Sequence, residues 1–145
     1  MRRLIALIAV VVASLAFATS AEAFVAKLKA PTHTPKAGAP WPIKVSAHTK
    51  KGKKLHASAY YAFLHSGQVV QICKPLPNKP AGRVCTSDPT PPNIGVFRYK
   101  FFGSYRDVVI WPNEAIFAGT LVFRVVVHVR HGGTKQLDYP VNVHG

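Results

Sequence analysis

Acidic residues are scarce in this sequence. Only five of its 145 residues are aspartate or glutamate, against 19 lysines and arginines, which gives a formal net charge of +14. Hydrolysis of a glycosidic bond generally needs two carboxyl groups held about 5 to 10 Å apart, and so few acidic residues leave little material for such a pair. The imbalance bears on association and solubility, whereas it says nothing about the fold.

No catalytic motif compensates for this scarcity. Asp107 and Glu114 are the only acidic pair worth considering, because they flank one short predicted strand, and both are read more simply as turn or loop residues. His65 and Ser66 are neighbours in a predicted turn, and neither a nucleophile elbow nor a glycine-rich phosphate loop occurs. We therefore predict no catalytic residue and no enzyme, with a small envelope hydrolase as an alternative.

Cysteine is equally scarce, since Cys73 and Cys85 are the only two. Their spacing is not the C-x-x-C of redox proteins, and an even number of cysteines in an exported chain predicts a disulfide. The bridge is expected to hold the proline-rich segment 74–93, read as an ordered loop. A blue-copper site needs a free cysteine thiolate among histidines, which the bridge would consume. We predict no metal or cofactor, with an exported copper-carrier-like protein as an alternative.

Long apolar runs are confined to the N-terminus. Arg2 and Arg3 precede an apolar run from Leu4 to Ala18, and the small residues of Ala21-Glu22-Ala23 follow it. This is the layout of a secretory signal peptide, and the run is shorter than the roughly 20 residues of a membrane span. We expect residues 1–23 to be a cleaved signal and residues 24–145 to form one secreted or extracytoplasmic domain. A signal retained as an anchor is the alternative.

The rest of the sequence, residues 24–145, has a regular alternation of residue types. Apolar and polar residues alternate at period two along most of it, which indicates half-buried strands separated by turns. The last two predicted strands form a hairpin in which Val129 pairs with Leu137, so that His128 faces Asp138 as a cross-strand pair. About seven or eight short strands without a helical stripe predict an all-β fold of two packed antiparallel sheets. A closed barrel is the alternative.

Two segments carry a family resemblance. PWPIKVSAHT and the closing GTLVFRVVVHVRHGGTKQLDYPVNV resemble secreted bacterial immunoglobulin-like domains over residues 24–145. The cysteines lie too close in sequence for an antibody-type bridge between sheets, so a fibronectin type III-like or bacterial immunoglobulin-like sandwich is the closer comparison. The resemblance implies binding, adhesion or spacing roles and transfers no functional residue.

The densest group of cations lies in one predicted turn and comprises Lys50, Lys51, Lys53 and Lys54. We expect an exported, non-enzymatic binding or structural module of the cell envelope or extracellular space. Its partner would be an anionic cell-surface polymer, contacted by these lysines, or another envelope protein; a merely solubilising turn is the alternative. Export and the inward alternation of the aromatic residues disfavour nucleic acid. Tyr60 and Trp111 are candidates for carbohydrate binding if they are exposed.

Overall fold

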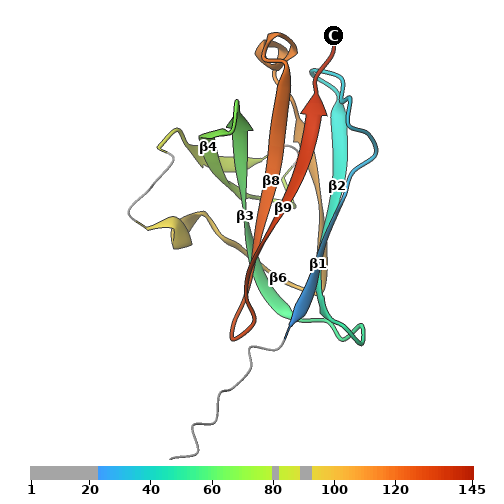
Figure 1. The fold of residues 1–145 in the computed structure, drawn as a ribbon, viewed down its shortest axis with the longest axis vertical. Coiled ribbons are helices and arrows are strands. Elements are labelled where there is room, and N and C mark those ends of the chain that lie inside the picture. The colour runs from blue at the N-terminus through green and yellow to red at the C-terminus, as the bar shows by residue number, and fades with distance from the viewer. Residues whose placement is uncertain (1–22, 80–81, 89–92) are drawn as a thin grey trace, which may run out of the picture.

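The computed structural model describes residues 23–79, 82–88 and 93–145, which form two antiparallel sheets packed face to face (Figure 1). The smaller sheet has the order β1-β2-β7. Its strands are β1 (Phe24–Lys29), β2 (Pro40–Thr49) and β7 (Ser104–Ile110). The larger sheet has the order β5-β4-β3-β8-β9, and β6 also pairs with β3. Its strands are β3 (His56–His65), β4 (Gln68–Pro75), β5 (Arg83–Thr86), β6 (Tyr99–Phe102), β8 (Thr120–Val129) and β9 (Gly133–Asn142). The prediction of an all-β, two-sheet fold is confirmed.

Helical structure in the described residues is limited to two short 3₁₀ helices, η1 (Ile94–Phe97) and η2 (Asn113–Phe117). The first follows the segment that holds the bridged cysteines, and the second lies between β7 and β8. Within residues 23–79, 82–88 and 93–145, no helix has the length and hydropathy of a membrane span.

The core lies between the sheets and follows from the predicted alternation. In β2, Trp41, Ile43 and Val45 are buried while the residues between them are exposed or half-buried, as expected when successive side chains point to opposite faces. Trp41 is the centre of an aromatic cluster: its ring lies 5.7 Å from that of Trp111 and 5.6 Å from that of Phe123, both edge-on. Such edge-on contacts favour packing beyond simple burial.

The chain changes sheets at Gly103, between β6 and β7. Gly103 has a φ of +72°, and a Cβ placed there would lie 2.8 Å from the side chain of Lys54. Its backbone N–H donates to the carbonyl of Leu55, and its carbonyl accepts from the N–H of Ala47. Glycine is needed here because the backbone is left-handed and the space beside it is filled. The crossing places β7 next to β2.

β3 and β4 form a hairpin whose turn lies at Ser66, within the turn predicted from the sequence. Ser66 and Gly67 both have positive φ, at 50° and 77°. This is the conformation that a two-residue hairpin turn requires. The prediction for segment 74–93 was wrong in part, because β4 continues to Pro75 and β5 pairs with it through Arg83, opposite Pro75. The pairing of the two cysteines brings these strands together despite the prolines.

The predicted register of the last hairpin was also wrong. Val129 pairs with Gly133, not with Leu137, so His128 faces Thr134 and Asp138 faces Arg124. The ladder already begins at Gly133, which the prediction had placed in the turn. A shift of an even number of residues preserves which side chains face the core. The alternation therefore identified the residues that face the core, such as Phe123, Val125 and Val127, but it could not fix the partners, and it did not predict that Val126 on the opposite face is buried as well.

Candidate functional site

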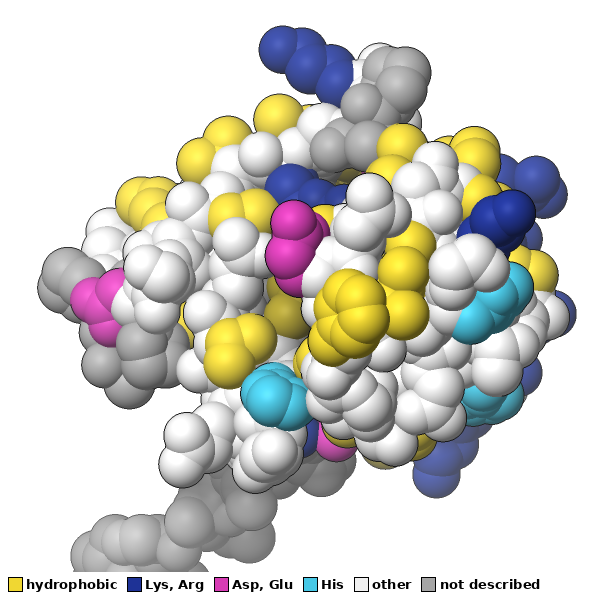
Figure 2. Space-filling view, turned by 90° about the horizontal axis from the view of Figure 1, so that it is seen from above, with side chains coloured by type: hydrophobic (Ala, Val, Ile, Leu, Met, Phe, Trp, Pro, Cys, Tyr) yellow, Lys and Arg dark blue, Asp and Glu magenta, His cyan; other side chains and the backbone are white. Residues whose placement is uncertain are grey.

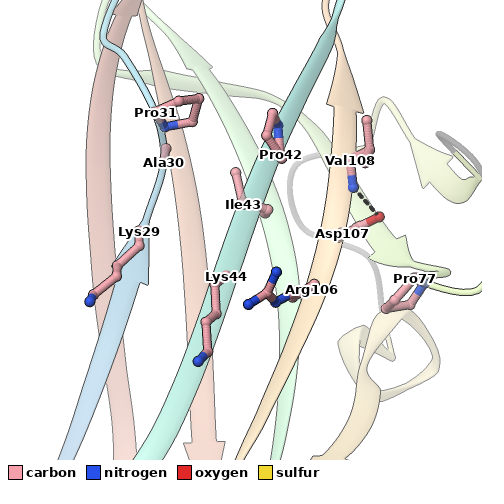
Figure 3. A pocket seen from close by; sticks show the side chains of 10 residues that line it. All are labelled: Lys29, Ala30, Pro31, Pro42, Ile43, Lys44, Pro77, Arg106, Asp107 and Val108. Atoms are coloured by element: carbon pink, nitrogen blue, oxygen red, sulfur yellow. Dashed lines mark hydrogen bonds between the residues drawn. The ribbon is translucent and has the colours of Figure 1, made fainter.

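The outer face of the small sheet carries a row of three cations. Lys29 on β1 pairs with Lys44 on β2, and Lys44 pairs in turn with Arg106 on β7. All three side chains are exposed, and Figure 3 shows them side by side across the three strands. We call these three residues the basic row.

The basic row is electrostatically unfavourable for the sheet itself. Like charges directly opposite each other on neighbouring strands are destabilising. Among the described residues the only ion pair joins Arg124 and Asp138, which belong to the other sheet. Within the described part of the chain the basic row therefore has no ion-pair partner, and its exposed charges are open to a ligand outside the sheet.

Above the basic row the same face is apolar. A shallow depression of about 470 Å³ is lined by the three cations on one side and by apolar residues on the other, and Asp107, which is only 6% exposed, is also part of its lining. The apolar residues include Ala30, Pro31, Pro42, Val108 and Pro77. Figure 3 shows Pro31, Pro42 and Val108 above the cations and Pro77 at the side. Pro77 comes from the segment between the two bridged cysteines, so this segment forms part of the wall.

Below the basic row lies a row with two hydroxyl groups. Lys27 pairs with Ser46, and Ser46 pairs with Ser104. Together with His48 and Lys54 these residues line a second depression of about 340 Å³ that adjoins the first, since both include Lys29 and Lys44. We call the surface formed by both depressions the first basic face. It combines ammonium, guanidinium and hydroxyl donors on three adjacent strands.

The predicted lysine turn contributes to this face in part. Lys54 lines the second depression, whereas Lys50, Lys51 and Lys53 line neither depression of the face. All four are exposed, and the turn is held by a hydrogen bond from the N–H of Lys53 to the hydroxyl oxygen of Thr49. The basic row was missed because its members are isolated in sequence. The alternation along each strand shows that these side chains face outward, but it does not predict the strand order β1-β2-β7 that brings them together.

The predicted His128–Asp138 pair does not form. Arg124 donates two hydrogen bonds to Asp138, from Nε at 2.6 Å and from Nη2 at 2.8 Å. These bonds hold the pKa of Asp138 below its ordinary value. Because both groups are on the surface, the pair contributes under about 1 kcal/mol. The Nδ1 atom of His128 instead lies 3.0 Å from the hydroxyl oxygen of Thr134.

A buried polar cluster lies behind the first basic face, between the sheets. Asp107 accepts a hydrogen bond of 2.7 Å from the Tyr61 hydroxyl and one of 2.8 Å from the N–H of Val108. Burial raises the pKa of Asp107, and the two hydrogen bonds and the Arg83 guanidinium oppose the rise. Burial raises the pKa of the Tyr105 hydroxyl, and the neighbouring Tyr61 hydroxyl opposes the rise. Glu114 is exposed on η2 and takes no part in these bonds.

The disulfide is confirmed between Cys73 and Cys85, which are directly opposed on β4 and β5. It lies within the larger sheet and does not join the two sheets. Cys73 is fully buried in the core. Two residues before Cys85, the guanidinium of Arg83 lies 5.3 Å above the ring of Phe63. The bridge thus fixes β5 and, with it, one cation near Asp107.

The two residues considered for carbohydrate binding lie outside the first basic face. Trp111 is only 2% exposed, so it belongs to the core and cannot stack on a sugar. Tyr60 is half-buried on the outer face of the larger sheet. No cluster of three or more potential metal ligands occurs within the described part of the chain.

Comparison with known proteins shows only distant likeness. No protein-family model matches the chain, and no curated protein matches it. A DUF4466 family protein from Parabacteroides merdae is similar with a TM-score of 0.47 and 14% identity, over 83% of this chain and 45% of that one. The sporulation control protein Spo0M from Bacillus subtilis is similar with a TM-score of 0.44 and 9% identity, over 85% and 50%. The chain spans half or less of the length of both.

Proposed function

We propose that this protein is an exported, non-enzymatic binding module of the immunoglobulin-like or fibronectin type III-like sandwich type. It would act at the cell envelope or in the extracellular space, where its first basic face docks on an anionic polymer. The basic row carries this proposal. Three cations directly opposite each other weaken the sheet, and a polyanion lying across them would turn this repulsion into attraction.

The arrangement suits a polymer better than a small anion. Neighbouring strands lie about 4.8 Å apart, and alternate residues along a strand lie about 6.7 Å apart. The face therefore presents a grid of donors over three strands, with the cations of Lys29 and Lys44 in one row and the hydroxyls of Ser46 and Ser104 in the next. A chain that carries repeated anionic groups and hydroxyls, such as an acidic glycan, can satisfy both rows.

Export is supported by two independent features. The N-terminal run has the layout of a signal peptide, and disulfides persist mainly in oxidising compartments outside the cytosol. The bridge between Cys73 and Cys85 is formed in the structure. A net charge of +13 after removal of residues 1–23 favours retention near anionic surfaces.

The proposal is tested by binding to dextran sulfate, with neutral dextran as the matched polymer. Protein recovered from an exporting host should bind dextran sulfate and should not bind neutral dextran. Its affinity for dextran sulfate should fall as the salt concentration rises, because binding releases counterions. A variant with Lys29, Lys44 and Arg106 changed to Ser should bind much more weakly. Its slope of log affinity against log salt should be shallower by about two to three, close to one unit per lost contact.

The matched control removes the same charge from the turn, by changing Lys50, Lys51 and Lys53 to Ser. This control should retain most of the affinity of the wild type. Equal losses in the two variants would show that only net charge matters, and a larger loss in the control would place the contact on the turn. Either result would overturn the assignment of the first basic face.

A further inference from the structure

A second group of basic residues, with Lys100 and Arg130 as its cations, lies on the outer face of the larger sheet. Lys100 on β6 and His128 on β8 both pair with Ser58 on β3, one from each side. Arg130 follows two residues after His128, and His56 precedes Ser58 by two residues, so both continue on the same face. We call these five residues the second basic face.

The second basic face surrounds a depression of about 380 Å³. Lys100, Arg130 and His56 are exposed, while Ser58 and His128 are half-buried in its floor. The contact of Nδ1 of His128 with the Thr134 hydroxyl leaves Nε2 for a ligand. No carboxylate lines the depression, and Asp138, on the same sheet, is already paired with Arg124. Lys100 and Arg130 therefore have no carboxylate beside them in this depression.

The two basic faces point away from each other. β3, β6 and β8 belong to one sheet, whereas β1, β2 and β7 belong to the other, and the core lies between them. Figure 1 shows β1 and β2 on one side of the molecule and β3 and β4 on the other. In the end-on view of Figure 2, lysine and arginine side chains project from several sides of the molecule. The two faces adjoin at one edge, where the chain crosses between the sheets: Lys54 and Gly103 line the first face, and His56 and Phe101 line the depression of the second. A straight chain lying flat across β1, β2 and β7 nevertheless does not also lie across β3, β6 and β8 on the other sheet.

We propose that the protein is bivalent and bridges two anionic polymer chains, one on each basic face. This inference rests on the proposed function of the first basic face and adds a second, independent contact. Bridging follows because two contacts that face opposite directions cannot both be occupied by one straight chain. A protein of this kind would cross-link an acidic glycan matrix instead of merely coating it.

A sandwich assay tests the inference. Dextran sulfate is attached to a surface, the surface is saturated with protein and washed, and fluorescent dextran sulfate is then added. We expect the wild-type layer to retain the fluorescent chain, and we expect no retention of fluorescent neutral dextran. The variant Lys100→Ser/Arg130→Ser should still bind to the surface through the first basic face, while its retention of label falls to the neutral-dextran level.

The matched control is Lys50→Ser/Lys51→Ser, which loses the same charge and should retain the label as the wild type does. Because Lys100 and Arg130 are exposed, circular dichroism should show an unchanged fold in their variant. Retention of label by Lys100→Ser/Arg130→Ser at the wild-type level would overturn bivalency, as would a wild-type layer that binds the surface but retains no label. Failure of the wild type to bind the surface at all would instead reject the proposed function.

Discussion

At the scale of single residues, the buried carboxyl group of Asp107 has the largest energetic consequences. It is 6% exposed and faces the interior from a strand whose outward neighbour, Arg106, belongs to the basic row. Its two hydrogen-bond donors, Tyr61 and Val108, satisfy both carboxylate oxygens. Burial of a charge is costly, which explains why the pKa of Asp107 is raised despite these bonds and the nearby Arg83 guanidinium.

The raised pKa of Asp107 predicts a particular pH dependence of stability. Above the ordinary pKa of 3.8 the folded protein holds a proton that the unfolded chain has lost. The free energy of unfolding contributed by this group therefore falls as pH rises from 3.8 to the folded pKa, and is constant above it. Urea unfolding measured from pH 3 to 7 should show this fall in the wild type and not in Asp107→Asn.

Asp138 supplies the internal control, because its pKa is lowered by the hydrogen bonds from Arg124. Its contribution is complete above pH 3.8 and is lost as pH falls below that value. The variant Asp138→Asn should therefore keep the fall that belongs to Asp107. An unchanged fall in Asp107→Asn would mean that another group is responsible.

At the scale of elements, the disulfide determines whether β5 remains part of the larger sheet. β5 has only four residues and lies at the edge, where it pairs with β4 alone. Cys73 and Cys85 are opposite each other in that pairing, so the bridge closes the loop from which Pro77 reaches the wall of the first basic face. Without the bridge, this short edge strand has little else to hold it.

Removal of the bridge should destabilise the protein by about 3 kcal/mol, the loop-closure value for a loop of this size. The variant Cys73→Ala/Cys85→Ala tests this by urea unfolding at neutral pH. Wild-type protein unfolded in the presence of a reductant should show a similar loss. A loss that is too small to measure in both would show that β5 is held by packing alone.

At the scale of the whole molecule, the distribution of charge matters as well as its sum. The net charge of +14 creates general repulsion, but only some cations lie directly opposite one another. Lys44 lies between Lys29 and Arg106, whereas Lys50 is exposed in the turn. Lys44 and Lys50 each carry one positive charge, so substitutions at these two positions change the net charge equally and differ only in the position of the charge that is removed.

We expect Lys44→Gln to raise the melting temperature at low salt, because it removes two unfavourable cross-strand pairs worth a few tenths of a kcal/mol each, up to about 1. Lys50→Gln should have a smaller effect. The difference should shrink as ionic strength rises to 0.15 M, where the Debye length is about 8 Å. If Lys44→Gln is no more stable than Lys50→Gln at low salt, the basic row is not strained.

Much of the fold followed from local pattern. The alternation in β2 and β8 identified Ile43, Val45 and Phe123 as inward residues, and the even number of cysteines predicted their pairing. The partner of Asp138 was predicted wrongly because a period of two is unchanged when a strand slides by an even number of residues. In the structure the ladder begins at the Val129–Gly133 pair, and this pair sets the partners along the whole hairpin.

The sequence by itself determined which residues alternate inward, which cysteines pair and how large the excess of positive charge is, because these depend on neighbours along the chain and on composition. Only the tertiary structure decided that Lys29, Lys44 and Arg106 lie in one row and that Lys100, Ser58 and His128 lie in another. These residues come from strands far apart in sequence, and which strands become neighbours is set by the packing of the whole chain.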